Sequence, residues 1–284
     1  MAEMRKTTPQ LLEYEHWNWT STPSPVVFRM DIPPFNDVRV RRAMLLATDL
    51  EAIRQSWNGG LGNIITYPFM YNPPYADLYI GLDSPDLPKD VKDLYTYNLE
   101  KAKQLLKEAG YPNGFKTQAL AVGTTEIDYL SIIKDMWSKA GVDLEILVRD
   151  SATRTNLVTN KTNPPVNMGG ATPPARFYQP WGLTGTSTQN PGMIFDPVIE
   201  KGLDPIRTLA MTDLHGAMKL MRELSKTYIL SQAFAIPVPT AQLYNVWWPW
   251  IKNYSGESAM LLGTSHRWLE WAWMDQKLKK SMGY

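Results

Sequence analysis

Apolar residues recur with the period of an α-helix in several parts of the chain. The clearest of these segments are residues 38–57, 99–109, 127–137 and 214–228. We expect the first to form one unbroken helix, with an N-cap at Asn36 and an end at Gly59. Asn98 should cap the second helix and Thr212 the last. Because an amphipathic helix buries its apolar face, the segments predict a fold with a sizeable core.

Shorter apolar or alternating runs between these helices predict β-strands. The runs are residues 11–30, 117–123, 142–148, 166–170, 234–239 and 243–248. A strand, a helix and a second strand follow one another over residues 117–148, which is typical of a β-α-β unit with parallel strands. Proline-rich stretches at 61–97 and 171–191 indicate long loops. The pattern therefore predicts an α/β fold with long Pro-rich loops.

Composition and charge exclude several classes of protein. The 29 Lys and Arg residues balance the 28 Asp and Glu residues to a net charge of +1, which argues against a nucleic-acid partner. Cysteine is absent, so disulfides and cysteine-ligated metals are excluded. No apolar run reaches the length of about 20 residues that a membrane helix needs. Residues 1–10 carry no apolar core and no cleavage site, so we expect no signal peptide in this chain.

Residue types that carry catalysis or bind metals form no recognisable set. His16, His215 and His266 lie in unrelated segments, without the spacing of a zinc or calcium site. We therefore expect no catalytic residue, no metal and no cofactor. A carbohydrate-active enzyme stays open as an alternative, because a pair of carboxylates for glycoside hydrolysis is defined by separation in space. The grouped tryptophans would give such an enzyme a stacking surface.

Two long segments are more specific than these patterns. Residues 33–43 read PPFNDVRVRRA and are followed by ATDLEAI at residues 47–53. Residues 97–114 read YNLEKAKQLLKEAGYPNG. These segments closely resemble the dipeptide and oligopeptide class of ABC-transporter solute-binding proteins, the extracellular family 5. The β-α-β unit and the later helices are similar to that family in order and spacing.

The resemblance implies a periplasmic-binding-protein-like lobe of the class II type, with a mixed sheet flanked by helices. Members of the family are two-lobed and about twice as long, and this chain is similar only to their C-terminal portion. It implies that residues 1–32 are strands leading from the first lobe and hinge, and that residues 33–231 form the second lobe. Residues 232–284 would be return strands and a tail toward the first lobe. We expect the hinge near residues 28–31 and 231–237.

One departure from the family pattern concerns the ligand. Peptide-binding members usually carry an aspartate after a strand of the second lobe, where it pairs with the α-ammonium group of the peptide. The matching stretch here, residues 166–181, contains no acid. Its candidate ligand-binding residues are Asn167, Arg176, Tyr178, Gln179 and Trp181. These side chains suit a carboxylate, a carbonyl or the face of a sugar better than an ammonium group.

The resemblance also implies partners and a location. The full-length protein would be extracytoplasmic, in the periplasm or at the cell surface, and would deliver a peptide-like or other small polar solute to an ABC permease without catalysis. Because the N-terminal lobe is missing, we expect an exposed apolar surface around residues 247–250 and self-association of the chain. A ligand-sensing module that uses the same lobe is a further alternative.

Overall fold

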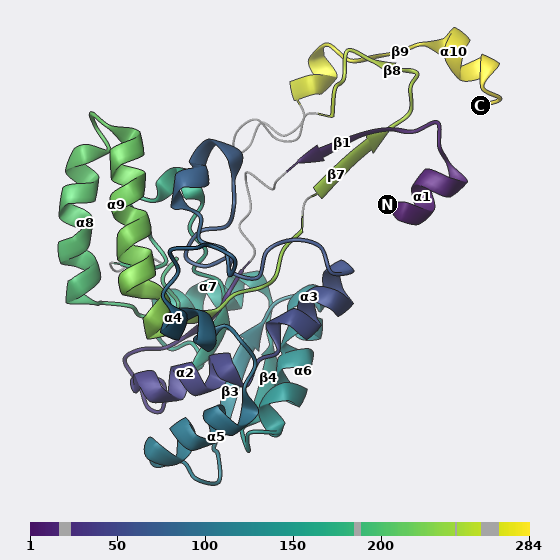
Figure 1. The fold of residues 1–284 in the computed structure, drawn as a ribbon. Coiled ribbons are helices and arrows are strands. Elements are labelled where there is room, and N and C mark those ends of the chain that lie inside the picture. The colour runs from purple at the N-terminus through teal and green to yellow at the C-terminus, as the bar shows by residue number, and fades with distance from the viewer. Residues whose placement is uncertain (17–23, 185–188, 242, 257–266) are drawn as a thin grey trace. The chain divides into compact units, whose positions relative to one another are not determined.

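The computed structural model describes residues 1–16, 24–184, 189–241, 243–256 and 267–284 (Figure 1). They form two units. The large unit comprises residues Thr22–Thr240, and the small unit combines Met1–Ser21 with Ala241–Tyr284. Within the predicted strand region 11–30, Trp17 and Trp19 lie outside the described residues, and so does His266.

The large unit is built on a mixed five-stranded sheet with the strand order β4-β3-β5-β2-β6. The strands are β2 Val26–Phe28, β3 Lys116–Ala121, β4 Asp143–Val148, β5 Val166–Met168 and β6 Ala235–Ile236. As the β-α-β pattern predicts, β3 runs parallel to β4, and it is also parallel to β5. In contrast, β2 pairs antiparallel with both β5 and β6. The α/β fold with a mixed sheet is therefore confirmed.

Both faces of the sheet are covered, because successive residues of a strand point to opposite sides. Val26 and Phe28 join one apolar cluster and Val27 joins the other. The first cluster contains side chains of α2 Val38–Leu46, α3 Leu50–Asn58, α5 Leu99–Glu108 and α6 Thr124–Ser138. The second contains side chains of α8 Pro197–Leu209 and α9 Leu214–Thr227, which lie side by side in Figure 1. Helices thus flank the sheet as expected.

The predicted helix over residues 38–57 is in fact two helices, and the prediction of one unbroken helix is wrong. The Asp49 carboxylate accepts a hydrogen bond from the backbone N–H of Ala52 at 2.9 Å and so caps α3. This cap requires Asp49 to leave the helical conformation, which ends α2 before it. The cap of α2 is Asp37 rather than Asn36, since the Asp37 carboxylate accepts from the Arg39 N–H at 2.8 Å.

Other element boundaries also differ from the predictions. Asp213 rather than Thr212 caps α9, and its carboxylate accepts from the Gly216 N–H at 2.9 Å. The proline-rich stretch 61–97 contains two short helices, η1 Pro73–Leu78 and α4 Lys89–Leu94. The remaining elements of the large unit are α7 Ser151–Thr159, η2 Pro174–Arg176 and η3 Ile229–Gln232.

The small unit consists of short strand pairs and short helices. Strands β1 Leu12–His16 and β7 Leu243–Trp247 pair antiparallel, and so do β8 Ile251–Lys252 and β9 Trp273–Met274. The helices are α1 Ala2–Thr7, η4 Arg267–Glu270 and α10 Gln276–Ser281. Among the described residues of the whole chain, no helix has the length and apolar character to cross a bilayer.

The tryptophans expected on an exposed surface at residues 247–250 are partly covered. Trp250 is buried beneath the rings of Trp248 and Tyr284, whose centroids lie 4.5 Å and 5.0 Å from its own. The expectation of an exposed surface is therefore wrong for Trp250. Among the described residues of this unit, the two most exposed of the large apolar side chains include Leu269, and both Leu269 and Trp273, which are 60% and 54% exposed, lie further along the chain.

Candidate functional site

The predicted ligand-binding residues belong to the segment that follows one of the three parallel strands. Because β3, β4 and β5 are parallel, their carboxyl ends lie at the same edge of the sheet. In open α/β sheets, ligands bind outside the carboxyl ends of the strands. The segment after β5, residues 169–184, starts at this edge, and we call it the β5 loop. It contains four of the five residues that the sequence predicts to bind a ligand, Arg176, Tyr178, Gln179 and Trp181.

The β5 loop is closed at its base by backbone contacts that only glycine permits. A Cβ atom on Gly182 would lie 1.7 Å from the carbonyl oxygen of Gly170, so the two ends of the loop approach each other without side chains between them. Gly170 itself has a φ of +74°. The Trp181 indole N–H donates to the carbonyl of Ala171 at 2.9 Å, which ties the same two ends together. The two ends of the β5 loop are therefore held together by direct contacts.

Two of the predicted residues, Arg176 and Trp181, are in contact in this loop, and a third, Gln179, is exposed near them in the chain. Phe177 is fully buried in the second apolar cluster and anchors the turn that follows η2. On either side of it, Arg176 and Gln179 are exposed, and the Gln179 N–H donates to the Arg176 carbonyl at 2.8 Å. The Arg176 guanidinium carbon lies 5.5 Å from the centre of the Trp181 ring, which is a cation–π contact. Arg176 thus presents a guanidinium group against an aromatic ring, and Gln179 is exposed in the same turn.

The other two predicted residues do not join this exposed group. Asn167 is 1% exposed, and its side-chain amide donates to the carbonyl of Pro164 at 2.7 Å. Its carbonyl oxygen is buried and has no hydrogen-bond partner among the described residues. Tyr178 is half-buried, and its ring packs perpendicular to the ring of Phe177, with 5.5 Å between the two ring centroids. The Asn167 side chain is therefore buried in the packing around β5, and the Tyr178 ring packs against the core.

The electrostatics of this edge favour an anionic group. Neither Arg176 nor Arg149, which follows β4, forms an ion pair with a carboxylate in the described part of the chain. Asp150 is occupied as the N-cap of α7, where the Thr153 hydroxyl donates to its carboxylate and lowers its pKa. Glu126, in the first turn of α6, is paired with Arg154 at 2.8 Å. Arg149 and Arg176 therefore follow two of the parallel strands without a carboxylate partner in the described part of the chain, and a guanidinium group favours an anionic ligand.

The sequence reading missed Arg149, Glu126 and Arg154. A signal for the first two was present in the sequence. Arg149 directly follows one predicted strand, and Glu126 lies at the start of the helix that follows a second predicted strand. Arg154 lies within a helix, and nothing in its local sequence marks it. Within the described residues, no group of three or more His, Asp or Glu side chains is placed to hold a metal ion.

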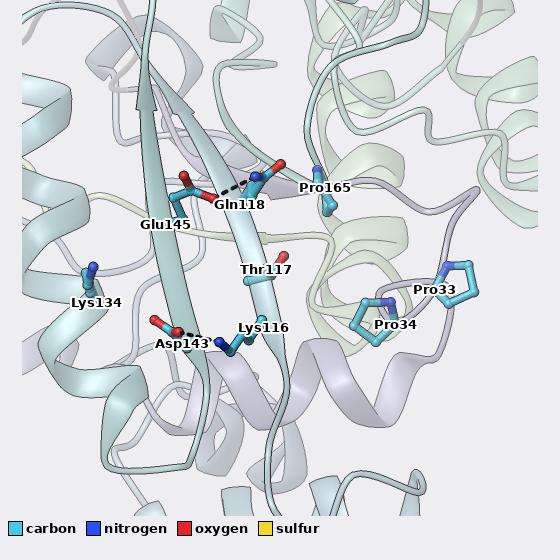
Figure 2. Close-up of a pocket in the computed structure, with 9 residues that line it drawn as sticks. All are labelled: Pro33, Pro34, Lys116, Thr117, Gln118, Lys134, Asp143, Glu145 and Pro165. Atoms are coloured by element: carbon cyan, nitrogen blue, oxygen red, sulfur yellow. Dashed lines mark hydrogen bonds and ion pairs between the residues drawn. The ribbon is translucent and has the colours of Figure 1, made fainter.

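A separate hollow lies at the opposite edge of the sheet (Figure 2). It has a volume of about 600 Å³ and is lined by Pro33, Pro34, Lys116, Thr117, Gln118, Lys134, Asp143, Glu145 and Pro165. Lys116 and Asp143 are the first residues of β3 and β4, and their charged groups lie 3.9 Å apart. Gln118 donates to Glu145 at 2.7 Å. None of the predicted ligand-binding residues lines this hollow.

Comparison with known proteins identifies the family of the chain. The model of the bacterial extracellular solute-binding proteins, family 5 (middle part), matches residues 4–190. The chain is 39% identical over 119 residues to heme-binding protein A of Haemophilus influenzae, which is 41% of this chain and 19% of that protein. It is 34% identical over 124 residues to the dipeptide-binding protein of Escherichia coli, which is 40% of this chain and 20% of that protein.

Solved structures agree with this assignment at the level of the fold. One is the periplasmic binding protein DppA of Helicobacter pylori in complex with the peptide STSA, with a TM-score of 0.70, 20% identity and coverage of 90% of this chain and 48% of that one. Another is HbpA2 of Haemophilus parasuis, with a TM-score of 0.66, 25% identity and coverage of 89% of this chain and 48% of that one. The chain thus spans about half the length of these structures. It belongs to the bacterial extracellular solute-binding proteins of family 5.

Proposed function

We propose that this chain forms the C-terminal lobe of an extracytoplasmic solute-binding protein that captures a small polar solute for an ABC importer. The solute is peptide-like or of another class, and it carries a carboxylate group that the β5 loop binds. The lobe binds and positions this solute, and the proposal requires no catalytic step. An ABC permease in the membrane and an N-terminal lobe are the protein partners that the proposal includes.

One observation carries the choice of a carboxylate. Arg176 is exposed at the carboxyl edge of the sheet, rests on the Trp181 ring and forms no ion pair with any described carboxylate. A guanidinium group binds a carboxylate through two parallel hydrogen bonds, and its planar face stacks on an aromatic ring at the same time. The absence of acids from residues 166–181 argues against an α-ammonium group at this position.

The division of the chain into parts stays a proposal, and the sheet supports it. We propose that residues 33–231 are the second lobe and that residues 1–32 and 232–284 lead toward the first lobe. The strand that enters the large unit, β2, pairs with the strand that leaves it, β6, through Val26 with Ile236 and Val27 with Ala235. Two adjacent connecting strands suit a hinge near residues 28–31 and 231–237.

The test is to identify what the protein retains when it is purified from its own source. Native mass spectrometry of the purified protein should show a bound small molecule, and fragmentation of that molecule should show a carboxylate. Arg176→Ala should lower the occupied fraction by about tenfold or more, because a charge-assisted contact is lost. Arg54→Ala is the matched control, since Arg54 is an arginine of α3 paired with Glu51 in the same unit. A protein without bound solute, or a bound amine without any acidic group, would overturn the proposal.

A further inference from the structure

The β5 loop is held at its start by a pair of charged residues from two different helices. Arg154 of α7 donates from one terminal nitrogen, Nη1, to Glu126 Oε1 of α6 at 2.8 Å. From the other, Nη2, it donates to the carbonyl oxygen of Met168, the last residue of β5. Both side chains are largely covered, with 23% of Arg154 and 17% of Glu126 exposed. We call this pair the Glu126–Arg154 bracket.

The bracket also contacts the end of the neighbouring strand. The second carboxylate oxygen of Glu126, Oε2, accepts a hydrogen bond from the backbone N–H of Val122 at 2.7 Å, directly after β3. The carboxyl ends of β3 and β5 are therefore joined through two side chains. A carboxylate and a guanidinium suit this task, because each offers two bonding positions in a fixed plane.

Gly169 shows how closely the bracket approaches the loop. A Cβ atom at Gly169 would lie 2.9 Å from Arg154 Nη2, and the residue has a φ of +144°. The loop therefore leaves β5 in a direction that Arg154 and the backbone of Gly169 set together. That direction decides where Arg176 and Trp181 stand relative to the sheet edge.

We infer that Glu126 and Arg154 are positioning residues that set the solute selectivity of the β5 loop. They keep the β5 loop in the conformation in which the Arg176 guanidinium can bind a carboxylate. They act through the loop rather than by contact with the solute. This inference rests on the proposed function of the loop. It adds that the preference for a carboxylate depends on two residues that lie outside the β5 loop.

The variants Glu126→Gln and Arg154→Lys test the bracket. Glutamine has one acceptor oxygen and keeps only one of the two contacts of Glu126. Lysine keeps the charge of Arg154 but loses the planar fork. The matched control is Asp86→Asn, which removes a carboxylate that Arg222 and Lys226 of α9 contact at 2.7 Å and 3.0 Å, in the same unit and outside both the hinge segments and the β5 loop.

Two readouts on the full chain separate positioning from general stability. The first is hydrogen exchange of the solute-free chain, in which amides of residues 169–184 should exchange about tenfold faster in the two bracket variants than in wild type or Asp86→Asn. The second is the ratio of affinities for N-acetyl-alanyl-alanine and its C-terminal amide, measured by calorimetry. Wild type and Asp86→Asn should prefer the acid by about tenfold, and the bracket variants should lose most of that preference.

Each outcome has a definite meaning. Unchanged exchange in the β5 loop, or faster exchange spread equally over the large unit, overturns the inference. An unchanged ratio of affinities beside faster local exchange overturns it too, because the bracket then only stabilises the loop. If wild type shows no preference for the acid, the proposed carboxylate function is overturned. Whether the bracket fixes the conformation of the β5 loop is then judged from the hydrogen-exchange rates alone.

Discussion

Two buried tyrosines of the large unit differ in what their hydroxyl groups contact. The hydroxyl of Tyr129 donates to the carbonyl of Pro237 at 3.0 Å. The hydroxyl of Tyr67 is equally buried and has no hydrogen-bond partner among the described residues. A buried polar group without a partner lowers the free energy of unfolding, whereas a paired one contributes to it. The two residues should therefore respond in opposite ways to loss of the hydroxyl.

Replacement of each tyrosine by phenylalanine tests this difference. Tyr129→Phe should lower the free energy of unfolding by about 1 kcal/mol, because the carbonyl of Pro237 loses its donor. Tyr67→Phe should raise it by up to about 1 kcal/mol, because only an unpaired hydroxyl is removed. Urea unfolding of both variants beside wild type measures the effects. Equal losses of stability in the two variants would contradict the expectation.

Buried tyrosines also predict how stability depends on pH. Burial raises the pKa of Tyr67, Tyr95 and Tyr129, and burial with a hydrogen bond to Asp196 raises the pKa of Tyr228 to about 12. Folding favours their neutral form, so their contribution is fully present below about pH 10 and is lost as the pH rises further. Arg41 acts in the opposite sense, since burial lowers its pKa to about 10.

Because the tyrosines outnumber this arginine, we expect the free energy of unfolding to fall as the pH rises from about 10 to about 11. Urea unfolding at a series of pH values measures the slope. Tyr67→Phe removes one of the groups and should make the fall less steep. A free energy that stays constant or rises over this range would show that the arginine or the unfolded state dominates.

At the scale of single elements, the N-caps show how accurately the local sequence predicts where a helix begins. Asn98 caps α5 as predicted, since its side chain accepts from the Lys101 N–H at 3.0 Å. For α2 and α9 the helices are present, but each cap lies one residue later than predicted. In both cases two neighbouring residues are able to cap, and the choice depends on where the buried face begins to pack.

The start of α9 offers a direct test of the corrected cap. Asp213→Ala should lower the free energy of unfolding by about 1 kcal/mol, because the Gly216 N–H loses its acceptor. Thr212→Ala should change it by less than about 0.5 kcal/mol, as a surface substitution away from a cap does. Thermal or urea unfolding of the two variants measures the contrast. A larger loss for Thr212→Ala would restore Thr212 as the cap.

At the scale of the whole molecule, the two units differ in how well they bury apolar side chains. The large unit has two apolar clusters, one on each face of its sheet. In the small unit, Leu269, Trp271, Trp273 and Met274 are all exposed, and the strands that the structure describes there pair only in twos. Sheets of two strands are only marginally stable in water, and exposed apolar groups of this kind favour association.

We therefore expect the chain to self-associate through the small unit. Sedimentation velocity over a range of concentrations should show species larger than the 32.3 kDa monomer. Substitution of Leu269, Trp271 and Trp273 by serine should shift the chain toward monomer. Serine at Met211, an exposed methionine of the large unit, is the control and should leave the distribution unchanged. A clean monomer at high concentration would count against the expectation.

The fold was largely predictable from the sequence, whereas the site was predictable only in part. The periodicity of residues 99–109 and 127–137 predicted α5 and α6, because helical periodicity is a local property. Arg176, Gln179 and Trp181 were named as candidates because they lie in the segment that matches the ligand-binding stretch of the family, and the structure brings Arg176 and Trp181 into contact. Asn167 was selected on the same grounds, yet its side chain lies inside the sheet, since strand register decides which side chains are covered.

The sequence by itself determined the α/β class, most of the helices and the absence of acids from the segment after β5. Each of these follows from residues that are neighbours along the chain. Only the tertiary structure decided that Gly170 meets Gly182, that the ring of Trp181 lies against Arg176, and that Arg154 links Glu126 to the end of β5. The first two contacts close one loop and the third joins separate elements, and all of them exist only once the packing of the sheet and the helices has fixed the path of the loop.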